Sequence, residues 1–148
     1  MAEIGFYHLT RTGVIAALPA LLGRTIAQGE RALVLCGSEQ QVAAIDDALW
    51  VCAAPDWLPH GTAGSPHPQW QPVFITAQEI NPARARYLFL VFGAEAADLA
   101  AYARVFDLFD GTDEAAVAAA RRRWQAAKAA GHGITYWKQG KTGWDKSA

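Results

Sequence analysis

Apolar residues follow two different repeats over the first fifty residues, and together these repeats predict an α/β fold. Residues 3–9 (EIGFYHL) and 31–36 (RALVLC) are short apolar runs typical of strands. Residues 13–28 place apolar side chains at helical spacing, and Gly29 follows where such a helix ends. Ser38 and Gln41 form a capping-box pattern that predicts a second helix to about Trp50. Strand, helix, strand and helix in this order indicate a βαβ unit.

The rest of the chain continues this alternation after one long interruption. Residues 51–72 hold five prolines and predict a long connection, which in compact domains often has a function. Three further strands are expected at 73–76, 86–92 and 104–109, with a short helix at 97–103. Residues 134–137 predict an edge strand, and 138–148 a polar tail that frays. No boundary divides residues 1–148, so we expect one domain.

The stretch from Thr112 to Gly131 is the longest helical pattern and carries the only dense basic cluster. Thr112 is the expected N-cap and Gly131 the expected stop. Small side chains gather on one side of the helical wheel, which suits close packing on a sheet: Ala116, Ala119, Ala120, Ala126, Ala127 and Ala130. Arg123 projects near the middle of this side, so we expect its stem along the sheet edge and its head in water.

Trp124 lies outside the alanine side, within about 60° of Arg121 and Lys128 on the wheel. One interpretation is that Trp124 covers the edge of the core and the arginines form a solvated face, as most charge runs do. The other is a small pocket with an apolar floor and a cationic rim. Such a pocket suits a peptide that combines carboxylates with a bulky apolar side chain. The helical pattern leaves both interpretations open.

Composition and charge narrow the class of protein. Hydrophobic residues make up 52% of the chain and charged residues 18%, which is typical of a compact globular protein. The net charge of −1 argues against a long nucleic-acid footprint, which needs a basic excess. The sequence shows no signal peptide and no spanning apolar run, so we expect a cytoplasmic protein. Cys36 and Cys52 form no CxxC pair and are expected to be reduced.

Motifs for enzymatic chemistry are missing from the sequence. Gly37 and Ser38 follow a strand and precede a helix, where nucleotide-binding folds place a phosphate loop, but no GxGxxG or GxxxxGK[ST] pattern occurs. The four histidines show no metal-ligand spacing, and His60 in LPHG is interpreted as a turn-stabilising or surface histidine. Asp46 and Asp47 diverge on a helix, and no GxSxG is present. We therefore expect no catalytic residue, no metal and no cofactor.

Tryptophan placement indicates a second surface. The chain has six tryptophans, a residue type enriched at the energetic centres of protein interfaces. Trp50 ends the second predicted helix, and Trp57 follows seven residues later in the proline-rich connection. We expect these two rings to share one apolar patch, whereas Trp70 is expected to cover a core edge.

Several blocks of the sequence resemble the chi subunit of bacterial DNA polymerase III. They occur in the family's order over nearly the whole chain: FYHL, DDALW at 46–50, WLPHGTAG at 57–64, QPVFIT at 71–76, FLVFGAE at 89–95, RVFDLFDG at 104–111, RRRWQAAKAAGH at 121–132 and TYW at 135–137. The LPHGTAG and VFDLFDG blocks are the specific ones. The resemblance implies a three-layer α/β/α sandwich with a mostly parallel sheet, similar to a nucleotide-binding fold without the phosphate loop.

The resemblance also implies a function without catalysis. The chi subunit is an accessory subunit of the clamp-loader assembly; it pairs with the psi subunit and binds the acidic C-terminal tail of single-stranded-DNA-binding protein. By the family pattern, the tail site falls on Arg121 and Trp124, with Lys128 nearby, and the psi surface falls on Trp50 and Trp57. Nucleic acid would then be contacted only indirectly, at the replisome. Some relatives carry a basic residue where Val117 stands here, so part of the tail-binding charge must come from Lys128, Arg122 or elsewhere.

Two other functional classes remain as alternatives. The basic, Trp-containing helix suits direct binding of single-stranded nucleic acid, with arginines on phosphates and Trp124 stacked on a base. The near-neutral net charge weighs against this alternative. A nucleotide-dependent enzyme on a similar fold is the other class, and it lacks the expected phosphate-binding motifs.

Overall fold

The structure, a computed structural model, describes residues 2–52 and 58–147. Its helices are α1 (Val14–Ala27), α2 (Glu39–Trp50) and α3 (Glu114–Ala129), with 3-10 turns at Pro68–Trp70 and Leu99–Ala101. Its strands are β1 (Glu3–Leu9), β2 (Ala32–Leu35), β3 (Gly61–Thr62), β4 (Val73–Thr76), β5 (Tyr87–Leu90), β6 (Arg104–Asp110), β7 (Gly133–Gln139) and β8 (Trp144–Lys146).

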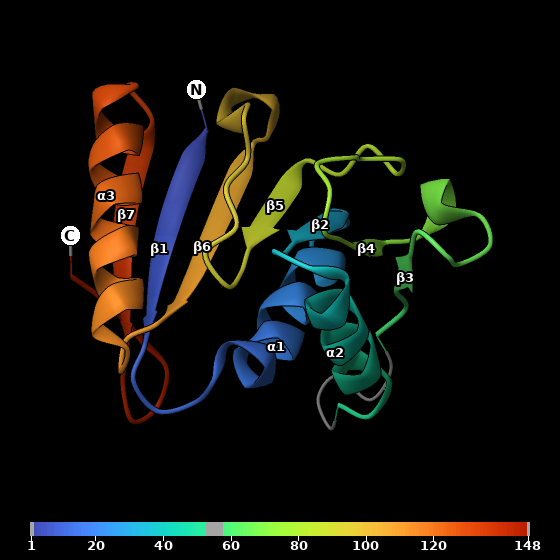
Figure 1. Cartoon of the computed structure of the whole chain (residues 1–148), viewed down its shortest axis with the longest axis horizontal. Helices are drawn as coiled ribbons and strands as arrows, with labels where there is room; N and C mark the ends of the chain where they lie inside the picture. The colour runs from blue at the N-terminus through green and yellow to red at the C-terminus, as the bar shows by residue number, and fades with distance from the viewer. Residues whose placement is uncertain (1, 53–57, 148) are drawn as a thin grey trace.

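These strands form one sheet in the order β3-β4-β2-β5-β6-β1-β7-β8 (Figure 1). Every described pairing is parallel except β7 with β8, which is antiparallel. The strands predicted at 3–9, 31–36, 73–76 and 104–109 are confirmed to within one residue at each end. The strand predicted at 86–92 ends earlier, because Phe92 has a φ of 55° and leaves the extended conformation.

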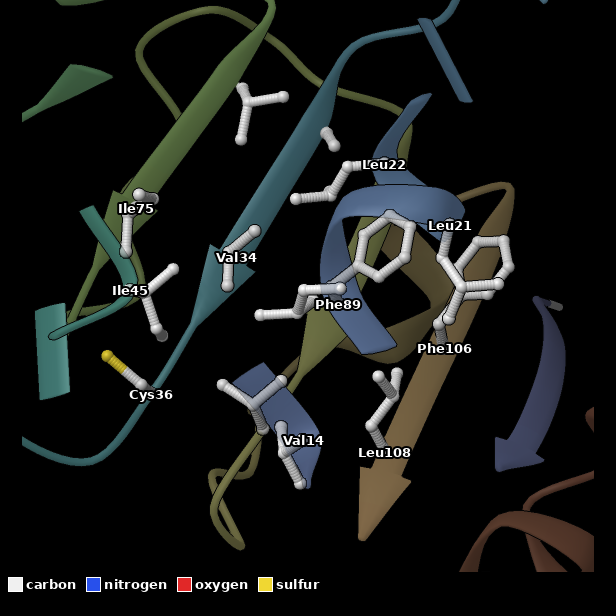
Figure 2. Close-up of a cluster of buried hydrophobic side chains, with 14 of the residues drawn as sticks. Val14, Leu21, Leu22, Val34, Cys36, Ile45, Ile75, Phe89, Phe106 and Leu108 are labelled. Atoms are coloured by element: carbon white, nitrogen blue, oxygen red, sulfur yellow. The ribbon is translucent and has the colours of Figure 1, made fainter. Parts of the chain in front are cut away.

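Helices cover both faces of the sheet, so the predicted α/β/α sandwich is confirmed. In β1, the side chains of Ile4 and Phe6 belong to the core on the α3 side, and those of Tyr7 and Leu9 to the core on the α1 and α2 side. Figure 2 shows the second of these cores, with α1 side chains packed over Phe89. Buried strand residues on both faces explain why the strands read as apolar runs.

The first turn of α3 differs from the sequence prediction by one residue. The N-cap is Asp113, whose Oδ1 accepts hydrogen bonds from Ala115 N at 3.0 Å and Ala116 N at 3.4 Å. The prediction of Thr112 as N-cap is wrong because its hydroxyl already donates to Asp110 Oδ1, at 2.6 Å. The predicted stop is confirmed: Gly131 follows the C-cap with a φ of 87°, a conformation that favours glycine.

The rotation of α3 about its axis also differs from the prediction. Ala120 and Ala127 are buried, and Val117 and Trp124 pack against the same core, whereas Ala126 is exposed. The side of α3 that faces the core is therefore centred nearer to Trp124 than the helical wheel predicted from the alanines. The reason is apolar area: an indole ring removes more surface from water than any single alanine methyl group.

Among the described residues, the segment 138–147 contributes two strands to the sheet, so the fraying predicted for this part of the chain is wrong. β7 reaches Gln139 and lies inside the sheet, because β8 pairs along its outer side. The Trp144 ring packs against the core and meets the Tyr7 ring edge-on, with 5.0 Å between centroids. Burial of this one large side chain explains how a polar segment is held.

Candidate functional site

Arg121, Trp124 and Lys128, here called the α3 rim, lie on one side of α3. Lys128 Nζ lies 4.9 Å from the centroid of the Trp124 ring, which is a cation–π distance. Arg121 and Lys128 are exposed, and Trp124 is half-buried. Neither cation is in an ion pair with any described residue. The rim thus combines an apolar ring with two charges that are available to a ligand.

Trp124 is held firmly by the core beneath it. Its ring packs against the core on the α3 side. Its Nε1 atom is buried and has no hydrogen-bond partner within the described part of the chain. An unsatisfied buried donor costs about 1–3 kcal/mol, so this indole lies in a position that the fold alone does not fully satisfy.

Two neighbouring strands extend the positive region beside the α3 rim. The rings of His8 on β1 and Tyr136 on β7 are hydrogen bonded, with 2.5 Å between Nδ1 and the hydroxyl oxygen. Burial lowers the pKa of His8, and the charges of Lys138 and Arg121 lower it further. Arg121 also acts on Tyr136, whose pKa burial raises and this charge counteracts. The charges of Lys138 and Arg121 thus both act on His8, and that of Arg121 acts on both members of the His–Tyr pair.

The sequence alone did not single out His8, Tyr136 or Lys138. Their proximity comes from the parallel register, in which His8 is opposite Lys138 across β1 and β7. Tyr136 and Lys138 are two residues apart on a strand, so they share one face of the sheet. The alternation of side chains along residues 134–138 could have placed Lys138 on the same face as Tyr136. The sequence prediction ended the strand at residue 137, so Lys138 was not included.

Arg123 does not have its head in water, and that prediction is wrong. Its Nε donates to Asp107 Oδ2 at 2.7 Å, and its Nη2 donates to Asp107 Oδ1 at 3.0 Å. Burial raises the pKa of Asp107. Burial alone would lower the pKa of Arg123. The hydrogen bonds to Asp107 and the negative charge of Asp107 have the larger combined effect, so the pKa of Arg123 is raised. The two-bond geometry keeps both groups ionised at neutral pH, so only Arg121, Arg122 and Lys128 of this cluster are free cations.

The second predicted surface contains Trp50, whose side chain is 65% exposed at the end of α2. Its ring packs on the buried His60 ring, with 4.7 Å between centroids. His60 Nδ1 is 2.8 Å from the carbonyl oxygen of Leu58, and its Nε2 is 3.0 Å from Asp46 Oδ1. The second contact does not have the geometry of a hydrogen bond. His60 is therefore a turn-stabilising residue and not a surface one.

The other predicted member of this surface, Trp57, lies outside the described residues, so the shared Trp50/Trp57 patch stays a prediction. Val51, beside Trp50, is 81% exposed. The covering role expected of Trp70 is wrong, since this ring is 65% exposed and stacks on His67 with 4.2 Å between centroids. An exposed tryptophan and valine at one helix end make an apolar surface that suits a protein partner.

The turn after β2 is built for a helix cap. Ser38 Oγ accepts from Gln41 N at 3.2 Å, so the predicted N-cap of α2 is confirmed. The return bond of a capping box is shifted by one residue, because Gln41 Oε1 accepts from Gly37 N, at 2.6 Å, where the box would use Ser38 N. The Gly37 amide is therefore already bonded to a side chain. Among the described residues, no three His, Cys, Asp or Glu side chains gather as a metal site requires, and no helix is long and apolar enough to cross a membrane.

Comparisons with known proteins agree on one family. The family model described as "DNA polymerase III chi subunit, HolC" matches residues 1–135. The chi subunit of DNA polymerase III from Escherichia coli (strain K12) is 30% identical over 107 residues, which cover 72% of each chain. A probable chi subunit from Rickettsia prowazekii (strain Madrid E) is 24% identical over 91 residues, which cover 62% of this chain and 55% of that protein. The chain belongs to the DNA polymerase III chi subunit family.

Proposed function

We propose that the chain links the clamp loader of DNA polymerase III, through the psi subunit, to the acidic C-terminal tail of single-stranded-DNA-binding protein. The chi family is an accessory part of the polymerase assembly and is not catalytic in itself. The α3 rim supports the contact with the tail, and the surface at Trp50 supports the contact with psi.

The observation that carries the tail proposal is the pairing of an anchored ring with free cations on the α3 rim. An acidic tail with an aromatic end places its carboxylates on Arg121 and Lys128 and its ring beside Trp124. Each exposed charge contact contributes only about 0–1 kcal/mol. The aromatic insertion therefore supplies most of the affinity, and the charges mainly steer and orient the tail.

Lys138 compensates for the missing cation at Val117. It is opposite His8 across β1 and β7, and its charge, like that of Arg121, lowers the pKa of that ring. A tail running across the rim toward β7 thus meets a third positive charge from a separate element. This arrangement supports Lys138 as a source of the remaining tail-binding charge.

Titration of a labelled acidic peptide that ends in Phe tests the tail site. We expect a dissociation constant in the micromolar range, about −8 kcal/mol, which suits a contact that exchanges as a replication fork moves. Trp124→Ala should weaken binding at least tenfold and Arg121→Gln about two- to fivefold. Arg122→Gln is the matched control, because it removes the same charge from the same helix in another direction. Unchanged affinity in Trp124→Ala would sink the assignment.

A gel shift separates the tail proposal from direct binding of single-stranded nucleic acid at the same rim. The isolated chain should not shift an oligonucleotide through the α3 rim. A tight shift that Arg121→Gln and Trp124→Ala both abolish, with no tail-bearing partner present, would favour the nucleic-acid alternative.

The psi contact is tested by co-purification with psi, for which the chain offers a close control. Trp50 and Trp70 are each 65% exposed, and each ring packs on a histidine ring. Trp50→Ala should abolish co-elution with psi on size-exclusion chromatography, whereas Trp70→Ala should leave it intact. Equal loss in both variants would show that general surface apolarity, and not the Trp50 surface, holds the partner.

A further inference from the structure

A row of aromatic rings runs across the sheet on the face opposite α3. Phe89 stacks on Phe106 with 4.3 Å between centroids, and Phe106 stacks on Tyr7 at 5.6 Å. Tyr7 stacks in turn on Trp137 at 6.2 Å, with an angle of 10° between the planes. These rings come from β5, β6, β1 and β7, which are neighbours in the sheet. Trp144 of β8 closes the outer end against Tyr7.

The row begins in the core and ends in a cavity. Phe89 is fully buried, whereas Trp137 and Trp144 are only half-buried. A cavity of about 220 Å³ lies between these two rings and the C-terminal half of α1, and Tyr7 and Arg24 are among its lining residues. We call it the Tyr7 cavity. It therefore presents indole surface to anything that enters from the β8 side.

Two arginines supply the charge in the Tyr7 cavity. Arg24 projects from α1 and Arg104 from the start of β6. Arg104 Cζ lies 4.8 Å from the centroid of the Phe106 ring, which holds the guanidinium against the aromatic row. No acidic residue lines the cavity, and neither arginine is in an ion pair with a described residue.

Tyr7 lines the cavity together with both arginines. Burial raises the pKa of Tyr7, and the charges of Arg104 and Arg24 act in the opposite direction. Unlike its neighbours Tyr87 and Tyr136, Tyr7 makes no side-chain hydrogen bond within the described part of the chain. The lining of the cavity thus combines one phenol and two guanidinium groups with no carboxylate.

We propose that the Tyr7 cavity binds one nucleotide unit, with its base against Trp137 and Trp144 and its phosphate on Arg24 and Arg104. Guanidinium groups match the oxygens of a phosphate, and two of them balance its double charge. Planar bases stack on aromatic side chains with little dependence on sequence. An acidic peptide offers one charge per carboxylate and is the weaker match to this pair.

The proposed ligand carries one phosphate group, and a protein without a basic excess can bind a ligand of this size. A net charge of −1 does not support a long nucleic-acid footprint, but two local arginines suffice for one phosphate. A free mononucleotide and the end of a single strand share this chemistry. Trp137 and Trp144 lie beyond residues 1–135, which the chi family model matches, so the cavity depends on the part of the chain outside that match.

Thymidine 5′-monophosphate, thymidine and an oligothymidylate are the probes, with indole N–H signals followed by NMR. Thymidine 5′-monophosphate should shift the signals of Trp137 and Trp144 and leave that of Trp124 in place, since Trp124 packs on the other side of the sheet. Thymidine, which lacks the phosphate, should bind at least tenfold more weakly. The logarithm of affinity for the oligothymidylate should fall with the logarithm of salt concentration with a slope of about −1.

Arg24→Gln is the decisive variant, because Arg24 is exposed on α1 and its replacement leaves the core intact. It should weaken nucleotide binding at least fivefold, and Arg122→Gln on the opposite face should change nothing. Trp144→Phe keeps an aromatic ring at the core and should weaken binding severalfold. Tighter binding of the oligothymidylate than of the mononucleotide identifies a strand end as the source, and equal binding identifies the free nucleotide.

Two results would overturn the proposal. One is nucleotide affinity that is the same in the wild type and in Arg24→Gln. The other is that an acidic peptide ending in Phe, and not the nucleotide, shifts Trp137 and Trp144 and loses affinity in Arg24→Gln. Neither result depends on the α3 rim, so the outcome stays separate from that of the tail-binding test.

Discussion

Arg123 on α3 donates two hydrogen bonds to the buried carboxylate of Asp107 on β6, at 2.7 and 3.0 Å. This pair ties the helix to the sheet one residue away from Trp124. Since consecutive helical residues point about 100° apart, fixing Arg123 also fixes the direction in which Trp124 and the α3 rim face. A residue in the middle of the basic cluster thus has a structural role, while its neighbours remain free to bind.

Replacing only one partner of the Asp107–Arg123 pair should greatly lower the free energy of unfolding, whereas replacing both partners should lower it much less. Asp107→Leu leaves a guanidinium that is largely buried and unpaired, and should lower the free energy of unfolding by about 3–5 kcal/mol. The double variant Asp107→Leu/Arg123→Met should recover most of that loss. Urea denaturation measures both. A double variant as unstable as Asp107→Leu would mean that the charges themselves are required.

The single variant Arg123→Met should make stability depend on pH. Burial already raises the pKa of Asp107, and loss of the arginine removes the groups that lower it. A carboxyl group with a raised pKa in the folded state stabilises the fold at low pH and loses that contribution as pH rises. The free energy of unfolding of Arg123→Met should therefore fall from about pH 4 to about pH 7, more steeply than that of the wild type.

Removing the N-cap of α3 gives a direct test of its position. Asp113→Ala should destabilise the protein by about 1 kcal/mol, because two backbone N–H groups lose their acceptor. Thr112→Ala, at the position that the sequence suggested, should cost less, since Thr112 bonds only to Asp110 and not to the helix. Thermal unfolding compares the two variants, and a larger loss in Thr112→Ala would contradict the observed cap.

His8 should make the wild-type protein less stable in mild acid. Burial lowers its pKa below the usual value of 6.5, and Lys138 and Arg121 lower it further. A histidine with a lowered folded pKa stabilises the fold above its unfolded pKa, and this contribution is lost as pH falls. The free energy of unfolding should decline below about pH 6.5, and His8→Gln should flatten this decline. Equal pH profiles would place the titrating group elsewhere.

Gly111 should not tolerate a side chain. A Cβ at this position would overlap the His8 ring and lie 2.5 Å from the Leu9 carbonyl oxygen, which is backbone and cannot yield. Gly111→Ala should lower the free energy of unfolding by about 1–3 kcal/mol. Gly133→Ala is the control, because the three atoms nearest to its new Cβ all belong to the movable carboxylate of Glu3. Similar losses in both variants, measured by urea denaturation, would argue against this explanation.

The sequence predicted most of the sheet because its central strands are buried on both faces and read as continuous apolar runs. It missed β3, which has two residues, and β8, which lies in a polar segment held by Trp144. Periodicity cannot detect strands this short. The apolar side of α3 was misplaced because six alanines outnumber one tryptophan on a wheel, although only Ala120 and Ala127 among them are buried.

The candidate site was predictable only where its residues share one element. Arg121, Trp124 and Lys128 are one turn apart on a helix, so their spacing alone brings them together. His8 and Lys138 join them through strand register, and Asp107 pairs with Arg123 across two elements. Such relations depend on tertiary packing, which a pattern along the chain does not encode.

β8 also determines how the sheet ends. A long parallel strand at an edge leaves a row of free backbone N–H and C=O groups that another chain can pair with. β8 covers β7 on that side with three residues, and β3 ends the sheet on the other side with two. Both boundaries are too short to template a further strand efficiently. Any self-association of this protein should therefore occur through its faces, and these short edge strands disfavour extension of the sheet into fibrils.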